Sequence, residues 1–291
     1  MRFQERVFTL FCWLCVLLTT VGVLGFIAFL VHHGGETISL SLFFEETPPL
    51  DAIFRFAPVW DGIWPACFGT LSIIALAGIT AIPLGIFCGI YLNEFGHDRW
   101  SNIFAFCMEV LAGIPSILIG LFGFALILFL RHTIMPDAKT CLLLSGFCMG
   151  LLTLPYMVQA TQSSLAGVSD DLRLMGASLG FSKGQTIRHI LLPSASEGIM
   201  SGIILSIGRA AEDTAVIMLT GAVANAGLPR SLFDTYEALP FFIYTTAAEY
   251  QTHDELQRGF GAALVLLAVS TSLFLLAHKL HTTMKNRWRQ G

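Results

Sequence analysis

The sequence predicts an all-α membrane protein with six transmembrane helices, and two observations carry this prediction. Of the 291 residues, 55% are hydrophobic and only 12% are charged, and the mean hydropathy of +0.72 lies well above that of soluble domains. The few charges are also spaced so that six stretches reach the roughly 20 apolar residues that a helix needs to cross a bilayer. We therefore expect a multi-pass membrane protein.

Five of the six predicted spans are plainly apolar, and the fifth in order carries several charges. The spans are expected at Val7–Val31, Ile63–Leu92, Ile103–Leu130, Cys141–Ala160, Glu197–Ala222 and Gly259–Ala277. The first is too long for the apolar region of a cleaved signal peptide, so we expect an uncleaved anchor. A further apolar stretch, 238–248, has about half the necessary length, which favours a re-entrant or interfacial segment on the outer face.

The distribution of Lys and Arg predicts that both termini are cytoplasmic. With the N-terminus inside, ten of the sixteen Lys and Arg residues lie on the cytoplasmic side, five lie outside, and Arg209 lies within a span. The five outer residues are Arg55, Arg131, Lys139, Arg230 and Arg258. Cytoplasmic loops retain Lys and Arg, and the opposite orientation would invert this ratio.

The fifth span contains the stretch "GRAAEDTAVIMLTG" at 208–221, with Arg209, Glu212 and Asp213 close together. An ionised side chain at the bilayer centre costs roughly 2.5–3.5 kcal/mol, so these groups must face protein or water. Offsets of three and four residues place both acids on the helical face of Arg209, where they can neutralise it. Two interpretations stay open: an ion pair that fixes helix packing, or an arginine that offers its planar fork to an oxyanion.

The longest inner loop, 161–197, predicts two short helices on the cytoplasmic surface. The first begins after Ser169 and is broken at Gly180; the second begins after Ser182 and is expected to stop at Pro193. A helix-in-groove contact with a soluble partner explains such a loop.

Several function classes find no support in the sequence. There is no phosphate-binding loop for ATP, no metal-ligand constellation and no catalytic arrangement of side chains. We therefore expect no cofactor, no metal and no enzymatic activity. An ion channel would not explain the inner loop with its glycine and proline.

The inner loop resembles the coupling loop of ABC importer permeases, whose signature is E-A-A, three residues, G, nine residues and I-x-L-P. Gly180, Ile190, Leu192 and Pro193 match in identity and spacing, whereas Leu174, Met175 and Gly176 stand at the E-A-A positions. The resemblance implies contact with an ATP-binding subunit through Leu174, Gly176, Gly180, Lys183, Arg188, Ile190, Leu192 and Pro193. A pairing of Glu109, in the third span, with Arg188 is a further hypothesis.

Three other stretches are similar to the phosphate-specific branch of these permeases. They are "DGIWPACFGTLSIIALAGITAIPLGIFCGIYLNEF" at 61–95, "LAGIPSILIGLFG" at 111–123 and "LPRSLFDTYEALPFFIY" at 228–244, the last resembling the A-type (PstA-type) permease. The resemblance covers about 60–291 and implies the type I ABC importer permease (MetI-like) fold with cytoplasmic coupling helices.

The fifth span resembles the "RAxGETAP" stretch of the phosphate permeases, with Glu212 where glycine is usual and Asp213 where glutamate is usual. The resemblance implies a substrate pathway that includes Arg209, Glu212, Asp213, Thr214 and Ser116. For Ser116 the alternative stays open that the Gly- and Pro-containing stretch around it is a kinked surface for helix packing.

The resemblance also implies an assembly in the bacterial inner membrane that imports inorganic phosphate. Its expected members are a second permease (PstC type), two ATP-binding subunits (PstB type) and an external phosphate-binding protein (PstS type), with the lipid bilayer and a phosphate-sensing kinase system as further partners and no nucleic acid. The alternatives are a permease for molybdate or sulfate and a phosphate-sensing scaffold. The expected organisation is an anchor at 1–31, an outer loop at 32–62, a permease domain at 63–280 and a basic cytoplasmic tail at 281–291.

Overall fold

The computed structural model describes residues 2–45, 47–55, 57, 59, 62–96 and 98–290, and its regular elements there are helices. Within this part of the chain, six helices are long and apolar enough to cross a membrane. They occupy Gln4–Thr37, Trp64–Phe95, Ser116–Thr133, Leu142–Ala166, Lys183–Glu212 and His253–Lys279. The prediction of an all-α protein with six spans is confirmed for the described residues.

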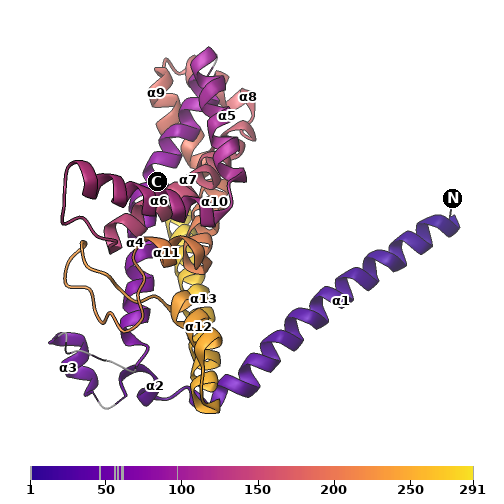
Figure 1. Ribbon diagram of the computed structural model, residues 1–291. Helices are drawn as coiled ribbons and strands as arrows, with labels where there is room; N and C mark the ends of the chain where they lie inside the picture. The colour runs from indigo at the N-terminus through magenta and orange to yellow at the C-terminus, as the bar shows by residue number, and fades with distance from the viewer. Residues whose placement is uncertain are drawn as a thin grey trace.

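The molecule is elongated, and the chain runs back and forth along its length (Figure 1). They are α1 (Arg2–Gly34), η1 (Gly35–Thr37), α2 (Leu40–Phe44), α3 (Pro49–Phe54), α4 (Trp64–Ile90), η2 (Tyr91–Phe95), α5 (Arg99–Gly113), α6 (Ser116–Thr133), α7 (Leu142–Ala166), α8 (Asp170–Ser178), α9 (Lys183–Thr186), η3 (Ile187–Leu191), α10 (Leu192–Glu212), α11 (Ala215–Thr220), α12 (Leu239–Glu249) and α13 (His253–Gln290). One end of the molecule holds α8 and α9, and the opposite end holds α2, α3 and α12 (Figure 1).

Helices α4 and α7 pack closely because glycines on each remove the side chains that would keep them apart. A Cβ atom on Gly85 or Gly89 of α4 would lie 2.6 Å from Met157 or Thr161 of α7. Gly146 of α7 in turn makes room for a side chain of α4, since a Cβ atom on Gly146 would lie 2.7 Å from Leu76. Small residues at such positions let membrane helices approach closely, so α4 and α7 form one tightly packed pair.

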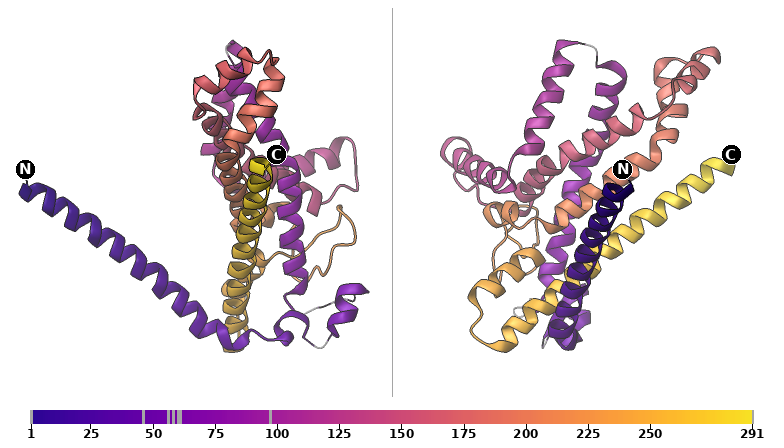
Figure 2. Two further views of the ribbon diagram at one scale, coloured as in Figure 1. Left: turned by 180° about the vertical axis from the view of Figure 1, so that it is seen from behind. Right: turned by 90° about the vertical axis from the view of Figure 1, so that its right-hand side faces the viewer.

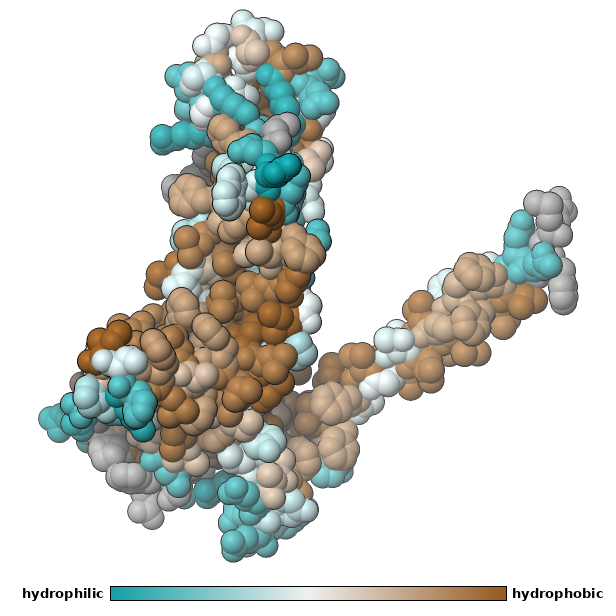
Figure 3. Space-filling model, turned by 45° about the horizontal axis from the view of Figure 1, so that its top comes forward, coloured by the Kyte–Doolittle hydropathy of each residue, from teal (hydrophilic) through white to brown (hydrophobic). Residues whose placement is uncertain are grey.

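Helix α1 points away from the rest of the molecule and contacts it near the C-terminal end of the helix (Figures 1 and 2). There a Cβ atom on Gly34 would lie 2.7 Å from the backbone of Phe260 in α13, and the rings of Phe29 and Phe260 are 5.5 Å apart. Figure 3 shows hydrophobic surface along α1 and around the middle of the molecule, with hydrophilic surface gathered toward the ends. This is the distribution that a bilayer requires of a protein that spans it.

The third predicted span is not one helix, and this prediction was wrong. Helix α5 ends at Gly113, Ile114 and Pro115 are extended with ψ of 127° and 137°, and α6 starts at Ser116 in a different direction (Figure 2). Pro115 has no amide to donate, and its ring disfavours a helical conformation at Ile114. Within this stretch Gly120 packs closely, since a Cβ atom there would lie 2.9 Å from the carbonyl oxygen of Ala215.

The fifth predicted span also differs from its expected bounds. Its helix does not stop at Pro193, because the π-helical turn η3 lets the Leu192 amide bond to the carbonyl of Ile187 and carries the chain into α10. A π-helical turn shifts the bonding pattern by one residue, which accommodates a proline that lacks an amide. At its other end α10 stops at Glu212, and Asp213 is extended with a ψ of 115° before α11 begins. The helix thus starts earlier and ends earlier than the sequence indicates.

The end of the molecule opposite α8 and α9 contains the short helix α12, which has 11 residues and is absent from the membrane-spanning candidates among the described residues. The prediction that 238–248 does not cross the membrane is confirmed for this described segment. Helix α13 continues to Gln290, so the backbone of the basic tail extends the last helix.

Candidate functional site

The break between α10 and α11 holds a partly buried ion pair. The Nη2 atom of Arg209 lies 3.0 Å from Oδ2 of Asp213, and the side chains are 35% and 3% exposed respectively. The second carboxylate oxygen, Oδ1, accepts a hydrogen bond of 3.0 Å from the amide of Val216 in the first turn of α11. Asp213 is therefore held through both oxygens, whereas Arg209 makes this one polar contact within the described part of the chain.

Glu212 lies apart from this pair. Its side chain is exposed and borders a largely apolar groove of about 530 Å³ between α1, α12 and α13, with Phe29 and Phe260 among the lining residues. Among the described residues Glu212 forms no ion pair and no hydrogen bond. The prediction that both acids share the face of Arg209 is confirmed for Asp213 and wrong for Glu212, because the last helical residue and the extended residue after it point to different sides.

The other two predicted pathway residues lie beside the helix break. Thr214 is the half-buried residue that immediately precedes α11, and Ser116 is the half-buried first residue of α6. One helical turn after Ser116, Gly120 packs against the backbone of Ala215, so the two helix starts are neighbours. Within the described chain no hydrogen bond joins Ser116 to Arg209 or Asp213.

At the opposite end of α10, the inner loop forms the two short helices that the sequence predicts. Gly180 joins them with a φ of +75°, a left-handed conformation that glycine adopts without strain. The amide of Phe181 bonds to the carbonyl of Gly176 and the amide of Gly180 bonds to Ala177, which is a Schellman motif. Ser182 then caps α9 in a reciprocal capping box with Gln185. These motifs confirm the predicted helix boundaries around Gly180.

The predicted coupling residues occupy different environments in this loop. Leu174 and Met175 are exposed large apolar residues, at 64% and 52%, and Gly176 is buried against Thr186. Three more loop residues are exposed, namely Gly180, Lys183 and Arg188. Three others are half-buried, namely Ile190 in η3 and Leu192 and Pro193 at the start of α10. The loop therefore exposes both apolar and basic side chains at the surface of the molecule.

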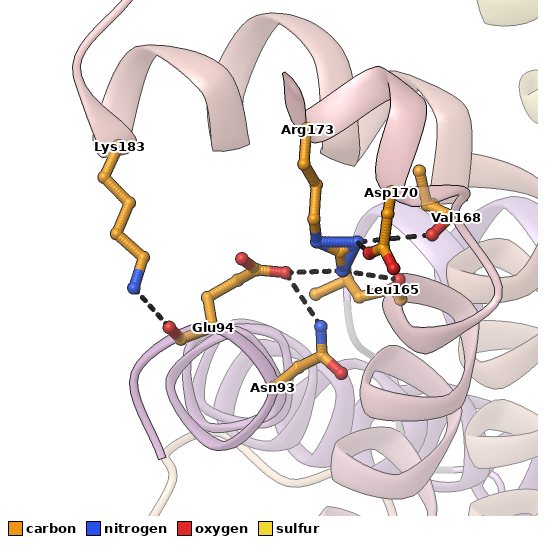
Figure 4. Close-up of polar contacts among 7 residues, drawn as sticks. All are labelled: Asn93, Glu94, Leu165, Val168, Asp170, Arg173 and Lys183. Carbon is orange, nitrogen blue, oxygen red and sulfur yellow. Dashed lines mark hydrogen bonds and ion pairs between the residues drawn. The ribbon is translucent and has the colours of Figure 1, made fainter. Parts of the chain in front are cut away.

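Sequence reasoning missed the ion pair that ties this loop to the membrane helices (Figure 4). The Nη2 atom of Arg173 in α8 lies 2.9 Å from Oε1 of Glu94 in the π-helical turn η2, and the Glu94 side chain is only 9% exposed. Asn93 donates a 2.8 Å hydrogen bond to the same oxygen. The usable signal was an acidic residue at the end of a predicted span, on the side where the distribution of Lys and Arg predicts the basic loop. The hypothesised pair of Glu109 and Arg188 is wrong, since neither residue forms an ion pair among the described residues.

Two of the stretches that carry the family resemblance contact each other. The hydroxyl of Thr70 in α4 accepts a 2.8 Å hydrogen bond from the amide of Leu239, and it donates one of 2.8 Å to the carbonyl of Ala66. Beside it, Gly69 packs directly against the carbonyl oxygen of Glu237. Residues 236–239 therefore pack on the first turns of α4 through Gly69 and Thr70.

Glu237, in the loop between α11 and α12, is expected to make stability pH-dependent. Burial raises the pKa of its carboxyl group above the ordinary 4.5, and the amides of Gly227 and Ala226 offset this rise only in part. Because the folded protein favours the protonated carboxyl group, Glu237 contributes to the free energy of unfolding. This contribution is fully present below pH 4.5 and is lost as the pH rises through the raised pKa. Glu237→Gln, which keeps an acceptor for Gly227, should therefore flatten the decline in thermal stability as the pH rises above 4.5 and through the raised pKa. Parallel melting curves of the two proteins across this range would contradict the assignment.

Comparison with known proteins decides the family. The family described as "Binding-protein-dependent transport system inner membrane component" matches residues 81–286. The "Phosphate transport system permease protein PstA 1" of Mycobacterium tuberculosis strain H37Rv is 35% identical over 232 residues, which cover 78% of this chain and 72% of that protein. The chain belongs to the PstA family of phosphate transport system permeases. The PstA proteins of Haemophilus influenzae, at 30% identity over 88% of this chain and 83% of the relative, and of Mycobacterium leprae, at 31% over 94% and 87%, are similar.

Solved structures show the same fold at low sequence identity. A bacterial alginate ABC transporter matches with a TM-score of 0.61 at 14% identity, over 92% of this chain and 95% of that chain. The MetNI methionine ABC transporter matches with a TM-score of 0.55 at 13% identity, over 78% and 97%. The predicted type I importer permease fold is thereby confirmed. This PstA-type permease is a multi-pass, non-catalytic inner-membrane component of a binding-protein-dependent system, which implies an ATPase, a second permease and a binding protein as partners.

Proposed function

We propose that this PstA-type permease forms half of the path by which inorganic phosphate crosses the membrane, with Arg209 as the group that attracts the anion. The observation that carries the proposal is the arrangement of Arg209, which is one-third exposed and held in place by the buried carboxylate of Asp213. A guanidinium group has five N–H donors in a planar fork that matches phosphate oxygens. The pair with Asp213 leaves donors of this fork available to a ligand.

The buried acid gives the site a second property. A lone arginine would bind phosphate tightly in a medium of low dielectric constant, and a trapped anion cannot be transported. Asp213 neutralises Arg209 when the path is empty and competes with the anion for it when the path is loaded. Thr214 and Ser116 lie at the two helix starts beside the pair and supply hydroxyl groups for the same path. Glu212 is left out of this path because it borders the groove next to α1.

We further propose how the site is driven. The loop of α8 and α9 fits a cleft of an ATP-binding subunit of the PstB type, and closure of two such subunits switches this chain and a PstC-type permease between inward- and outward-facing states. A PstS-type protein delivers phosphate at the opposite end. The excess of Lys and Arg on the side of the loop supports cytoplasmic N- and C-termini.

The function is tested by uptake of radiolabelled phosphate into proteoliposomes that contain the four kinds of subunit and ATP inside. We expect uptake that requires this chain, that stops when ATP is withheld, and that unlabelled phosphate suppresses while equal concentrations of sulfate and molybdate do not. Equal suppression by sulfate or molybdate would assign the path to another oxyanion. Phosphate uptake that persists in vesicles without this chain would overturn its role in transport.

A further inference from the structure

The loop of α8 and α9 is fixed to the cytoplasmic ends of α4 and α7 by two of its cations, Arg173 and Lys183 (Figure 4). Helix ends leave up to four backbone carbonyls without an internal partner, and they carry partial negative charge. A cation placed at such an end satisfies carbonyls and is favoured by the helix dipole. Both cations use this principle, each at a different helix.

Arg173 contacts both membrane helices at once. Its guanidinium group donates to the carbonyl of Leu165 in the last turn of α7 at 3.1 Å and to the carbonyl of Val168 just after that helix at 3.2 Å. The same group pairs with Glu94 in η2, which continues α4, at 2.9 Å, in a position where both side chains are largely shielded. Asp170, in the same helix as Arg173, is a weak additional partner because its side chain is 93% exposed and lies 3.8 Å from the guanidinium group.

Lys183, the first residue of α9, provides the second connection. Its ammonium group donates to the backbone carbonyl of Glu94 and lies 4.3 Å from the ring centre of Phe95. Cations over aromatic rings gain further attraction from the ring electrons. Glu94 thus receives a cation from α8 at its carboxylate and a cation from α9 at its carbonyl oxygen.

The helices that receive these contacts are tightly packed against each other. Because Gly85 and Gly89 bring α4 into close contact with Met157 and Thr161 of α7, the two helices cannot slide independently without losing close packing. A displacement of α8 therefore reaches this helix pair through the Arg173 and Glu94 contact. Without that contact, α8 keeps the bonds from Arg173 to the carbonyls of Leu165 and Val168 and its packing on Thr186 through Gly176, but it loses its ion pair with η2.

We propose that Glu94 is a positioning residue for coupling: it locks α8 and α9 to the α4 and α7 pair, so that movement of an ATP-binding subunit is transmitted to the transport path. The proposal rests on the proposed function as an ATP-driven phosphate permease. The loop signature that this sequence resembles begins with a glutamate, and Leu174 stands at that position. In this chain the carboxylate that contacts the loop is supplied by Glu94 of η2.

The test measures phosphate uptake and ATP hydrolysis in the complete reconstituted complex with Glu94→Asp, Glu94→Gln and Glu94→Ala. We expect the phosphate moved per ATP hydrolysed to fall in that order. The ratio should drop about tenfold for Glu94→Ala, the factor expected when a charge-assisted hydrogen bond is lost. Glu94→Gln keeps an acceptor for Asn93, so this variant tests the positioning role of Glu94 if the alanine variant fails to assemble. The retained charge of Glu94→Asp should rescue part of the ratio.

The matched control is Lys139→Gln, which removes an exposed ion pair with Asp234, 3.7 Å long, in the loops outside α8 and α9. Its ratio should equal that of the wild-type complex. Unchanged ratios in assembled Glu94→Gln and Glu94→Asp complexes, or uptake and hydrolysis that fall together, would overturn the positioning role. Failure of the wild-type complex to take up phosphate would instead refute the proposed function, so the two failures are distinct.

Discussion

Replacing Arg209 by glutamine together with Asp213 by asparagine is expected to reduce phosphate uptake by about 100-fold, the upper range for loss of charge-assisted hydrogen bonds to an anion. Glutamine offers one amide group in place of the charged fork, so it cannot neutralise phosphate in a medium of low dielectric constant. Uptake of radiolabelled phosphate into proteoliposomes measures the effect. Size-exclusion chromatography of the complex checks that the subunits still assemble.

The double substitution is needed because of how Asp213 is buried. Arg209→Gln alone leaves a carboxylate that is 3% exposed without its partner, and such unpaired buried charges cost about 3–5 kcal/mol. The single variant would therefore confuse loss of folding with loss of binding. Asparagine at position 213 keeps an oxygen that can accept the Val216 amide, so the first turn of α11 stays capped.

The chain offers a matched control for this pair in Asp51 and Arg55. They have the same spacing of four residues and an ion pair of 3.2 Å, but their side chains are 42% and 80% exposed on the outer side. Asp51→Asn with Arg55→Gln should leave uptake unchanged, because exposed ion pairs contribute little. Near-normal uptake by the Arg209 and Asp213 double variant would remove the pair from the proposed path and leave it with a role in packing.

Gly69→Ala is expected to lower the free energy of unfolding by about 3 kcal/mol, the upper part of the range for overpacking. A Cβ atom at this position would overlap the carbonyl oxygen of Glu237 and lie 3.1 Å from the ring of Tyr236. Backbone atoms cannot move aside as a side chain can. The methyl group would therefore lift residues 236–239 from α4 and strain the hydrogen bond between Leu239 and Thr70.

Gly78→Ala, in the same helix, is the control for Gly69→Ala. The nearest atom to a Cβ there is Cδ1 of Ile82 at 3.5 Å, which is ordinary contact. Because alanine favours helices over glycine by about 0.5–1 kcal/mol, this variant should be as stable as the wild type or slightly more stable. Thermal unfolding in detergent compares the two. Equal melting temperatures for both alanine variants would show that the outer segment is not seated on Gly69 as described.

Local patterns in the sequence predicted the membrane helices and the form of the inner loop. Hydropathy reports whether a segment can cross a bilayer, and six such segments were found in the expected order. The Ser182 cap and the Gly180 break were equally readable, since capping and left-handed conformations depend on a few adjacent residues. Hydropathy does not report backbone continuity, so the break at Asp213 and the passage through Pro193 were not foreseen, and at Pro115 the sequence indicated a kink rather than two separate helices.

By itself, then, the sequence determined the fold class, the six spans, the two-helix loop and the cluster of charges around Arg209. The tertiary structure decided which acid Arg209 pairs with, because the end of α10 separates Glu212 from Asp213. It also decided that Glu94 meets Arg173, although 79 positions separate them in the chain. Periodicity and composition act over a few helical turns. Ion pairs between distant segments depend on how whole helices pack, and here the glycines of α4 and α7 bring the two ends together.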